Sequence, residues 1–153
     1  MPSSYTKIYV QVILAVKGRQ SLIHQSWEEE LFKYISGIIK NKDQQILAIN
    51  GVPNHIHILI RMRPTCVLSD LVREIKKASN AFIKEQGFTE KKFSWQEGFG
   101  AFSYNWNAVE NVVNYINRQK EHHKVKSFKE EYVEFLKNFE VDYEDEYLFD
   151  WVE

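Results

Sequence analysis

The stretch QILAINGVPNHIHILIR, residues 45–61, decides the fold. Residues 45–52 and 55–61 are rich in isoleucine, leucine and valine, and each predicts a β-strand. Pro53 and Asn54 lie between them and favour a tight turn. We therefore expect the two strands to pair as an antiparallel hairpin.

Strand and helix patterns alternate on both sides of this hairpin. Residues 5–16 predict a strand, and residues 27–41 predict a helix with Ser26 as its N-cap. After the hairpin the sequence predicts a helix from Leu68 or Ser69 to just before Gly87, a strand over 93–104, a helix over 108–124 and a helix from Ser127. The order β-α-β-β-α-β followed by two helices is the ferredoxin-like plan: an α+β fold with an antiparallel sheet, helices packed on one face and further C-terminal helices. No repeat or linker interrupts it, so a single domain over residues 1–153 is expected.

The net charge of -1 conceals a split along the chain. Residues 1–126 carry 18 Lys+Arg against 11 Asp+Glu, a balance of +7, whereas residues 127–153 carry 2 against 10, a balance of -8. The basic body suits phosphate binding. The acidic C-terminal helix and tail, residues 127–153, is expected to fold back on the body, to discourage nonspecific binding or to aid solubility.

Composition excludes several classes of protein. Cys66 is the single cysteine and cannot form an internal disulfide, which fits a reducing cytoplasm. No stretch approaches the roughly 20 apolar residues of a membrane span, and no signal peptide is evident, so we expect a cytoplasmic protein without a membrane partner. A glycine-rich phosphate loop is also missing, so no nucleotide cofactor is expected.

Two histidines in the second strand of the hairpin are candidate metal ligands. Successive strand side chains alternate between faces, so His55 and His57 point to one face while Ile56, Ile58 and Ile60 point to the other. Two imidazoles on one face can hold one metal ion. By itself the pair is weak evidence for a metal site, because two hydrogen-bonded histidines near a strand end give the same pattern.

Two helices carry further candidates. Tyr115, Gln119 and His122 follow one another at i, i+4 and i+7 and form one stripe, which is also typical of a solvated helix face. The helix from Leu68 presents a basic face that could lie along phosphates or simply face solvent: Arg73, Lys76, Lys77, Asn80 and Lys84. Four aromatic residues could stack on unpaired bases, although core packing is expected for at least two of them: Trp95, Phe99, Phe102 and Trp106.

Together these features resemble the single-tyrosine HUH transposases of the insertion-sequence 200/605 kind, including their relatives associated with repetitive extragenic palindromes. The resemblance is carried by the hairpin residues 51–59, the Lys-Lys-Ala-Ser run at 76–79, the strand residues 95–103 and the helix residues 115–123. Each motif is short, but their order and separation make the joint match specific.

The resemblance implies roles for individual residues. His55 and His57 correspond to the histidine pair, Gln119 to the third metal ligand and Tyr115, carried on a C-terminal helix, to the nucleophile. The implied cofactor is a divalent metal, Mg²⁺ or Mn²⁺, and the implied partners are single-stranded DNA with hairpins and a second copy of the chain in a homodimer. From its place on the same stripe, His122 is a candidate for proton transfer or a phosphate contact.

The expected reaction is transesterification, in which Tyr115 attacks a phosphodiester and forms a 5′-phosphotyrosine intermediate. Two alternatives stay open. One is a domesticated relative that nicks chromosomal palindromic repeats. The other is a noncatalytic ferredoxin-like module that binds nucleic acid, and metal-dependent cleavage of single-stranded DNA would distinguish it.

Overall fold

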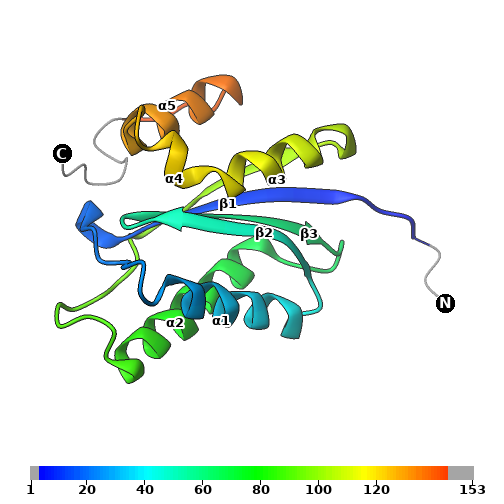
Figure 1. Ribbon diagram of the computed structural model, residues 1–153. Coiled ribbons are helices and arrows are strands. Elements are labelled where there is room, and N and C mark those ends of the chain that lie inside the picture. Colours follow the sequence, from blue (N-terminus) through cyan, green and yellow to red (C-terminus); the bar gives the residue numbers. More distant parts are fainter. Residues whose placement is uncertain (1–3, 145–153) are drawn as a thin grey trace.

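The computed structural model describes residues 4–144, and its framework is one four-stranded antiparallel sheet in the order β2-β3-β1-β4 (Figure 1). The hairpin strands β2 and β3 pair from Gln45 opposite Arg61 to Val52 opposite His55. Along its other edge, β3 pairs with β1. This order is that of the expected ferredoxin-like plan. The strands are β1 (Ile8–Ala15), β2 (Gln45–Val52), β3 (His55–Met62) and β4 (Gly100–Tyr104).

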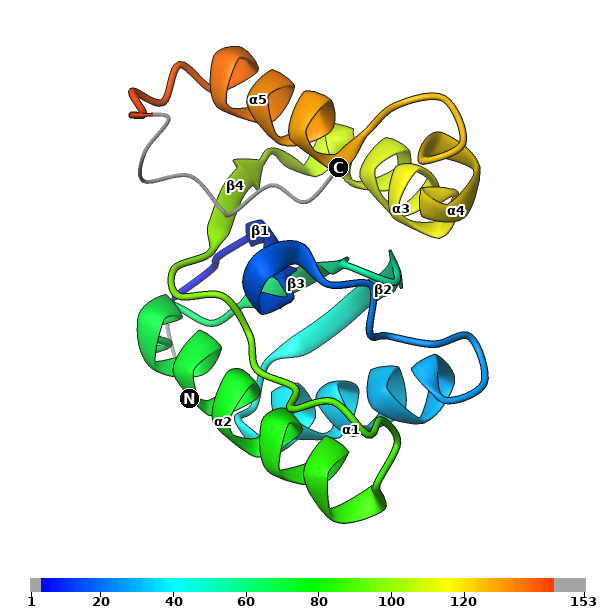
Figure 2. The ribbon, with the colours of Figure 1, turned by 90° about the vertical axis from the view of Figure 1, so that its left-hand side faces the viewer.

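Helices cover both faces of the sheet (Figures 1 and 2). In Figure 2, α1 and α2 lie below the sheet, whereas α3, α4 and α5 lie above it. The α+β class, with separate C-terminal helices, is therefore confirmed. The helices are α1 (Glu28–Asn41), α2 (Leu68–Gln86), α3 (Val109–Asn117), α4 (Gln119–His122) and α5 (Phe128–Asn138), with short 3-10 turns η1 (Lys17–Arg19) and η2 (Trp106–Ala108).

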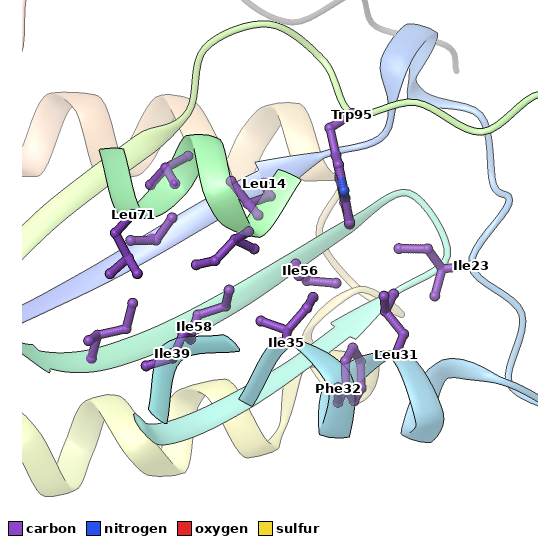
Figure 3. Packing of buried hydrophobic residues seen from close by; sticks show 14 of the residues in the cluster. Leu14, Ile23, Leu31, Phe32, Ile35, Ile39, Ile56, Ile58, Leu71 and Trp95 are labelled. Atoms are coloured by element: carbon purple, nitrogen blue, oxygen red, sulfur yellow. The ribbon is translucent and has the colours of Figure 1, made fainter. Parts of the chain in front are cut away.

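The main core lies between the sheet and the pair α1 and α2 (Figure 3). Ile56, Ile58 and Ile60 of β3 are fully buried there, against Ile35 of α1 and Ile75 of α2. Side chains alternate along a strand, so this burial directs the histidines of β3 to the opposite face, as the sequence predicts. A membrane-crossing helix is not found within residues 4–144.

The expected strand over residues 93–104 is shorter in the structure. Only Gly100–Tyr104 forms β4, and an isolated bridge joins Trp95 to Val16. Between these two pairings Gly98 adopts a left-handed conformation with φ 79°, which turns the chain out of the sheet. The carbonyl oxygens of Gln96 and Gly98 accept hydrogen bonds from the Lys76 ammonium and not from a neighbouring strand.

Two helix boundaries also differ from the expectation. The helix predicted over 108–124 is divided at Arg118, which has φ -103° and ψ 18°, into α3 and α4. Ser26 is not the N-cap of α1, because Trp27 holds that position and the Ser26 side chain bonds to His24. Ser127 does cap α5, since its hydroxyl accepts a hydrogen bond from the Glu130 backbone.

Gly51 allows the close approach of β2 and β3 that positions His55. A Cβ atom at Gly51 would lie 2.5 Å from the His55 carbonyl oxygen and 2.9 Å from Ile56 Cα, both backbone atoms. We expect Gly51→Ala to lower the free energy of unfolding by about 1–3 kcal/mol, measured by urea denaturation.

Gly37→Ala is the control, because a Cβ there meets nothing within 4 Å. In the middle of α1 it is expected to stabilise the protein by about 0.5–1 kcal/mol. Equal stability of the Gly51→Ala protein and the wild type would contradict the tight approach.

Candidate metal and nucleophile site

His55 and His57 lie side by side on β3 and are fully buried. Each has its Nδ1 atom next to a side-chain carbonyl: Asn54 Oδ1 at 2.7 Å from His55 and Gln11 Oε1 at 2.6 Å from His57. Gln11 is itself fixed, because its Nε2 donates to the Tyr104 hydroxyl at 2.8 Å. An Nδ1–H that donates to a carbonyl leaves Nε2 with a free lone pair, as a metal ligand requires.

Tyr115 and Gln119 reach these histidines from the two sides of the break at Arg118. The Tyr115 ring lies 6.0 Å from the His57 ring, and the Gln119 side chain is fully buried beside His123, with its Oε1 3.1 Å from His123 Nε2. The structure therefore brings together the four residues to which the resemblance assigns a metal-binding or nucleophile role: His55, His57, Tyr115 and Gln119. His122 stacks on the Tyr115 ring at 4.5 Å.

Glu131 of α5 is at the centre of the cluster, and the sequence did not single it out. Its Oε1 atom lies 3.3 Å from His55 Nε2, 3.1 Å from His57 Nε2 and 3.2 Å from His123 Nε2. Its Oε2 atom accepts hydrogen bonds from the Tyr115 hydroxyl and from Gln119 Nε2. The glutamate is only 2% exposed, so these contacts replace solvent.

The burial of the cluster shifts its protonation equilibria. Burial lowers the pKa of His55 to about 3, which keeps that imidazole neutral. Burial alone would raise the pKa of Glu131, but the electrostatic attraction of His57 and close contacts with the imidazoles of His123, His55 and His57 outweigh it and hold that pKa well below its ordinary value. The pKa of Tyr115 is raised by burial and by the adjacent Glu131 charge. In this state Tyr115 keeps its proton.

The same cluster fits a divalent metal ion. One ligand atom from each of His55, His57, His123 and Glu131 lies within 4.8 Å of all the others. His55 Nε2 is a buried nitrogen without a hydrogen-bond partner among the described residues, although Glu131 Oε1 lies 3.3 Å away. Neutral imidazoles and carboxylates are the usual ligands of divalent transition metals.

A cavity of about 370 Å³ opens beside Tyr115 and reaches the cluster. Tyr115, Glu131 and Gln11 line its inner end, and the aromatic rings of Tyr104 and Phe135 line its wall. It offers an approach to the Tyr115 hydroxyl from outside. The metal side is more closed, because Phe128 of α5 stacks on the His55 ring at 3.7 Å.

The basic residues of α2 lie on the opposite face of the sheet and separate into two groups. Arg73 pairs with Asp70 on the surface, and Lys76 is half-buried and bound to backbone carbonyls, where burial lowers its pKa. The other three line a groove of about 560 Å³ together with two lysines that the sequence did not single out: Lys77, Asn80 and Lys84, with Lys91 and Lys92. This set is named the lysine groove below.

The four aromatic residues proposed for base stacking also separate. Trp95 and Phe102 are buried core residues, in agreement with the expectation that at least two would pack inside. Trp106 is 58% exposed, with the Lys7 ammonium 4.3 Å from its ring centroid. It is the most accessible of the four.

The ferredoxin-like sheet, the HUH-type histidine pair on a central strand and the family match together indicate the class of protein: a transposase with a histidine cluster that could hold a metal ion. Residues 4–119 match the family model described as "Transposase IS200 like", so the chain belongs to the IS200-like transposase family. His123 and Glu131 lie beyond the matched residues. No curated protein sequence matches the chain.

Two solved structures share the fold. One is a protein of Deinococcus radiodurans R1 described as a transposase, with a TM-score of 0.64 and 18% identity, covering 78% of this chain and 95% of that one. The other is a REP-associated tyrosine transposase bound to a REP hairpin, with a TM-score of 0.58 and 21% identity, covering 100% of this chain and 90% of that one.

Proposed function

We propose that this transposase nicks and joins single-stranded DNA by transesterification, with Tyr115 as the nucleophile and a divalent ion, Mg²⁺ or Mn²⁺, bound by His55, His57 and Gln119. The observation that carries the proposal is the meeting of the Tyr115 hydroxyl and the two β3 histidines at a single buried carboxylate. This hydrogen bond to Glu131 favours Tyr115 among the eight tyrosines of the sequence.

The proposed reaction forms one phosphoester bond and breaks another. The Tyr115 oxygen forms a bond to phosphorus, the bond to the 3′-oxygen breaks, and the products are a 5′-phosphotyrosine and a 3′-hydroxyl. Because the bond energy is retained, a different 3′-hydroxyl can attack the phosphotyrosine and join new strands. A bound divalent ion supplies Lewis-acid stabilisation of charge on the phosphate.

Other residues of the chain position these groups. Gln11 and Asn54 hold the imidazoles so that their Nε2 atoms face the cluster. The hydroxyl proton of Tyr115 is held by Glu131, and His122, stacked on the tyrosine ring, is a candidate to accept that proton or to contact a phosphate. The cavity beside Tyr115 is the proposed path for the single strand.

The direct test is incubation with single-stranded DNA that carries a hairpin, with MnCl₂, MgCl₂ or EDTA. We expect a protein–DNA band that survives denaturing electrophoresis only when the metal is present. Hairpin binding without any cleavage would instead support the noncatalytic binding module.

The relative bound to a REP hairpin favours a second candidate within the same chemistry. In this case the chain is a domesticated enzyme that nicks chromosomal palindromic repeats and moves no element. Comparison of adduct yield on repeat hairpins and on element-end hairpins from the same genome distinguishes the two. In either case we propose action in the cytoplasm, on DNA of the nucleoid.

We propose that the hairpin binds at the lysine groove, with the single strand continuing around the edge of the sheet to the Tyr115 cavity. Lysine ammonium groups bind phosphates, and for duplex DNA each one removed lowers the slope of log K against log salt by about 0.9. The double variant Lys77→Ala/Lys84→Ala is expected to weaken hairpin binding and to lower that slope by about 2.

The charge-matched control for this prediction is Lys33→Ala/Lys40→Ala on α1, which removes two exposed lysines outside the groove. It is expected to change the slope little. Equal slopes for both double variants in fluorescence anisotropy titrations would place the hairpin elsewhere.

We also propose a homodimer, which light scattering would detect.

A further inference from the structure

We propose that the divalent ion is bound by His123 and Glu131 as well as by His55 and His57, and that Glu131 links this ion to the Tyr115 nucleophile. One carboxylate oxygen, Oε1, binds the ion, and the other, Oε2, holds the tyrosine hydroxyl. The inference rests on the proposed function and adds two ligands to it. Both residues lie after residue 119, where the family match ends.

The hydrogen bonds of the two β3 histidines favour a cation within the cluster. The Nδ1–H groups of His55 and His57 are directed at Asn54 Oδ1 and Gln11 Oε1, so the Nε2 atoms carry lone pairs. These lone pairs face Glu131 Oε1 at 3.3 and 3.1 Å. Two lone pairs and an anionic oxygen repel one another unless a proton or a metal cation lies among them. A divalent cation at this point satisfies all three atoms.

The third histidine completes the same arrangement. His123 Nε2 lies 3.2 Å from the same Oε1 atom, and the His123 ring packs edge-on against the His55 ring at 4.6 Å. Three imidazole nitrogens thus converge on one carboxylate oxygen from two separate parts of the chain, β3 and the end of α4. Mixed nitrogen and oxygen donors of this kind suit Mn²⁺ better than Mg²⁺.

The position of Glu131 on its helix also favours a role as a ligand. Along α5 the buried residues Phe128, Tyr132 and Leu136 form the side that faces the sheet, and Glu131 belongs to this side. A buried carboxylate is costly unless it is paired and hydrogen-bonded. Its neighbour Glu134 is exposed and paired with Lys126, as an ordinary surface glutamate is. Burial therefore singles out Glu131.

The second oxygen of Glu131 gives the site its coupling to the nucleophile. Oε2 accepts from the Tyr115 hydroxyl and, at 3.3 Å, from Gln119 Nε2. A single rigid carboxylate therefore sets the distance between the ion and the attacking oxygen. Gln119 positions Glu131 through this Nε2 hydrogen bond, and its Oε1, 3.1 Å from His123 Nε2, faces the cluster for its own proposed ligation.

The test is calorimetric titration of the full-length protein with MnCl₂ alone, without DNA. We expect Glu131→Gln to weaken Mn²⁺ binding by more than about tenfold, because even outer-shell partners of metal ligands are worth that much. His123→Gln is expected to weaken it by at least about tenfold, and the control Glu134→Gln to leave it unchanged. Unchanged or tighter binding by Glu131→Gln overturns the proposal, since the carboxylate would then only occupy the place of the cation.

Two further measurements distinguish the loss of a metal ligand from misfolding and from failure of the proposed function. Melting of each metal-free variant checks folding, and the visible spectrum of bound Co²⁺ is expected to change in both Glu131→Gln and His123→Gln. An unchanged spectrum, or a wild type that binds no Mn²⁺, contradicts the added ligands. Metal binding that depends on Glu131 in a protein that forms no DNA adduct would reject the proposed function alone. An adduct that forms while Glu131→Gln binds Mn²⁺ like the wild type would reject this inference alone.

Discussion

The Tyr115→Phe variant is expected to bind a DNA hairpin as tightly as the wild type and to form no covalent adduct with it. Phenylalanine preserves the ring that stacks on His122 and meets His57, so the packing of α3 is retained. The variant lacks only the phenolic oxygen, which is the proposed nucleophile. The measurement is denaturing electrophoresis of labelled single-stranded DNA after incubation with Mn²⁺, beside anisotropy for binding.

Tyr104 is the informative control, because it lines the same cavity as Tyr115. Its hydroxyl accepts a hydrogen bond from Gln11, and burial raises its pKa to about 12. Tyr104→Phe removes a support of the Gln11 carboxamide but no nucleophile, so it is expected to keep the adduct at a reduced rate. An adduct that survives in Tyr115→Phe and disappears in Tyr104→Phe would reverse the assignment.

The β2–β3 hairpin of the protein could be predicted from its sequence almost completely. The boundaries of β2 agree with the prediction to the residue, and β3 extends only one residue beyond its predicted end at Arg61. Turn residues and a period-two pattern are local signals, so they fix both the hairpin and the face to which His55 and His57 point. The prediction for the strand before Tyr104 is too long, because the carbonyl oxygens of Gln96 and Gly98 bind Lys76 of α2 instead of continuing the ladder between Trp95 and Gly100.

The break between Tyr115 and Gln119 carries no comparable signal. Neither proline nor glycine occurs near Arg118, and the helical spacing of 115, 119 and 122 continues through it. The helical stripe still predicts the correct neighbours, because Tyr115 and Gln119 both reach Glu131. A break of this kind is set by tertiary packing, which propensity does not describe.

The charge count of residues 127–153 does not distinguish Glu131 from the other acidic residues of that segment. Its signal is positional: residues 128, 131, 132 and 136 follow the helical spacing of a buried stripe, and Glu131 is the one charged member. A carboxylate on an apolar stripe indicates a buried partner. The acidic segment thus folds back on the body through α5, while residues after 144 lie outside the described part of the chain.

The second large effect concerns the metal. His57→Ala is expected to lower the rate of adduct formation by roughly a thousandfold in saturating Mn²⁺, and EDTA is expected to do the same to the wild type. The magnitude follows because a Lewis acid supplies several kcal/mol of transition-state stabilisation, about 4 kcal/mol being a thousandfold. Adduct formation is measured as a time course on one hairpin substrate.

Substitution of His57 is a more informative test than substitution of His55, because the His57 imidazole contacts both Gln11 and Glu131. Its Nδ1 is fixed by Gln11, and its Nε2 lies nearest of the three histidines to Glu131 Oε1. His24→Ala is the matched control, since His24 is exposed and bonds only locally to Ser26. Restoration of the His57→Ala rate by excess Mn²⁺ would mean that His57 affects affinity alone. An adduct formed at the wild-type rate in EDTA would remove the metal from the chemistry altogether, and Tyr115 would then require activation by protein groups of the cluster.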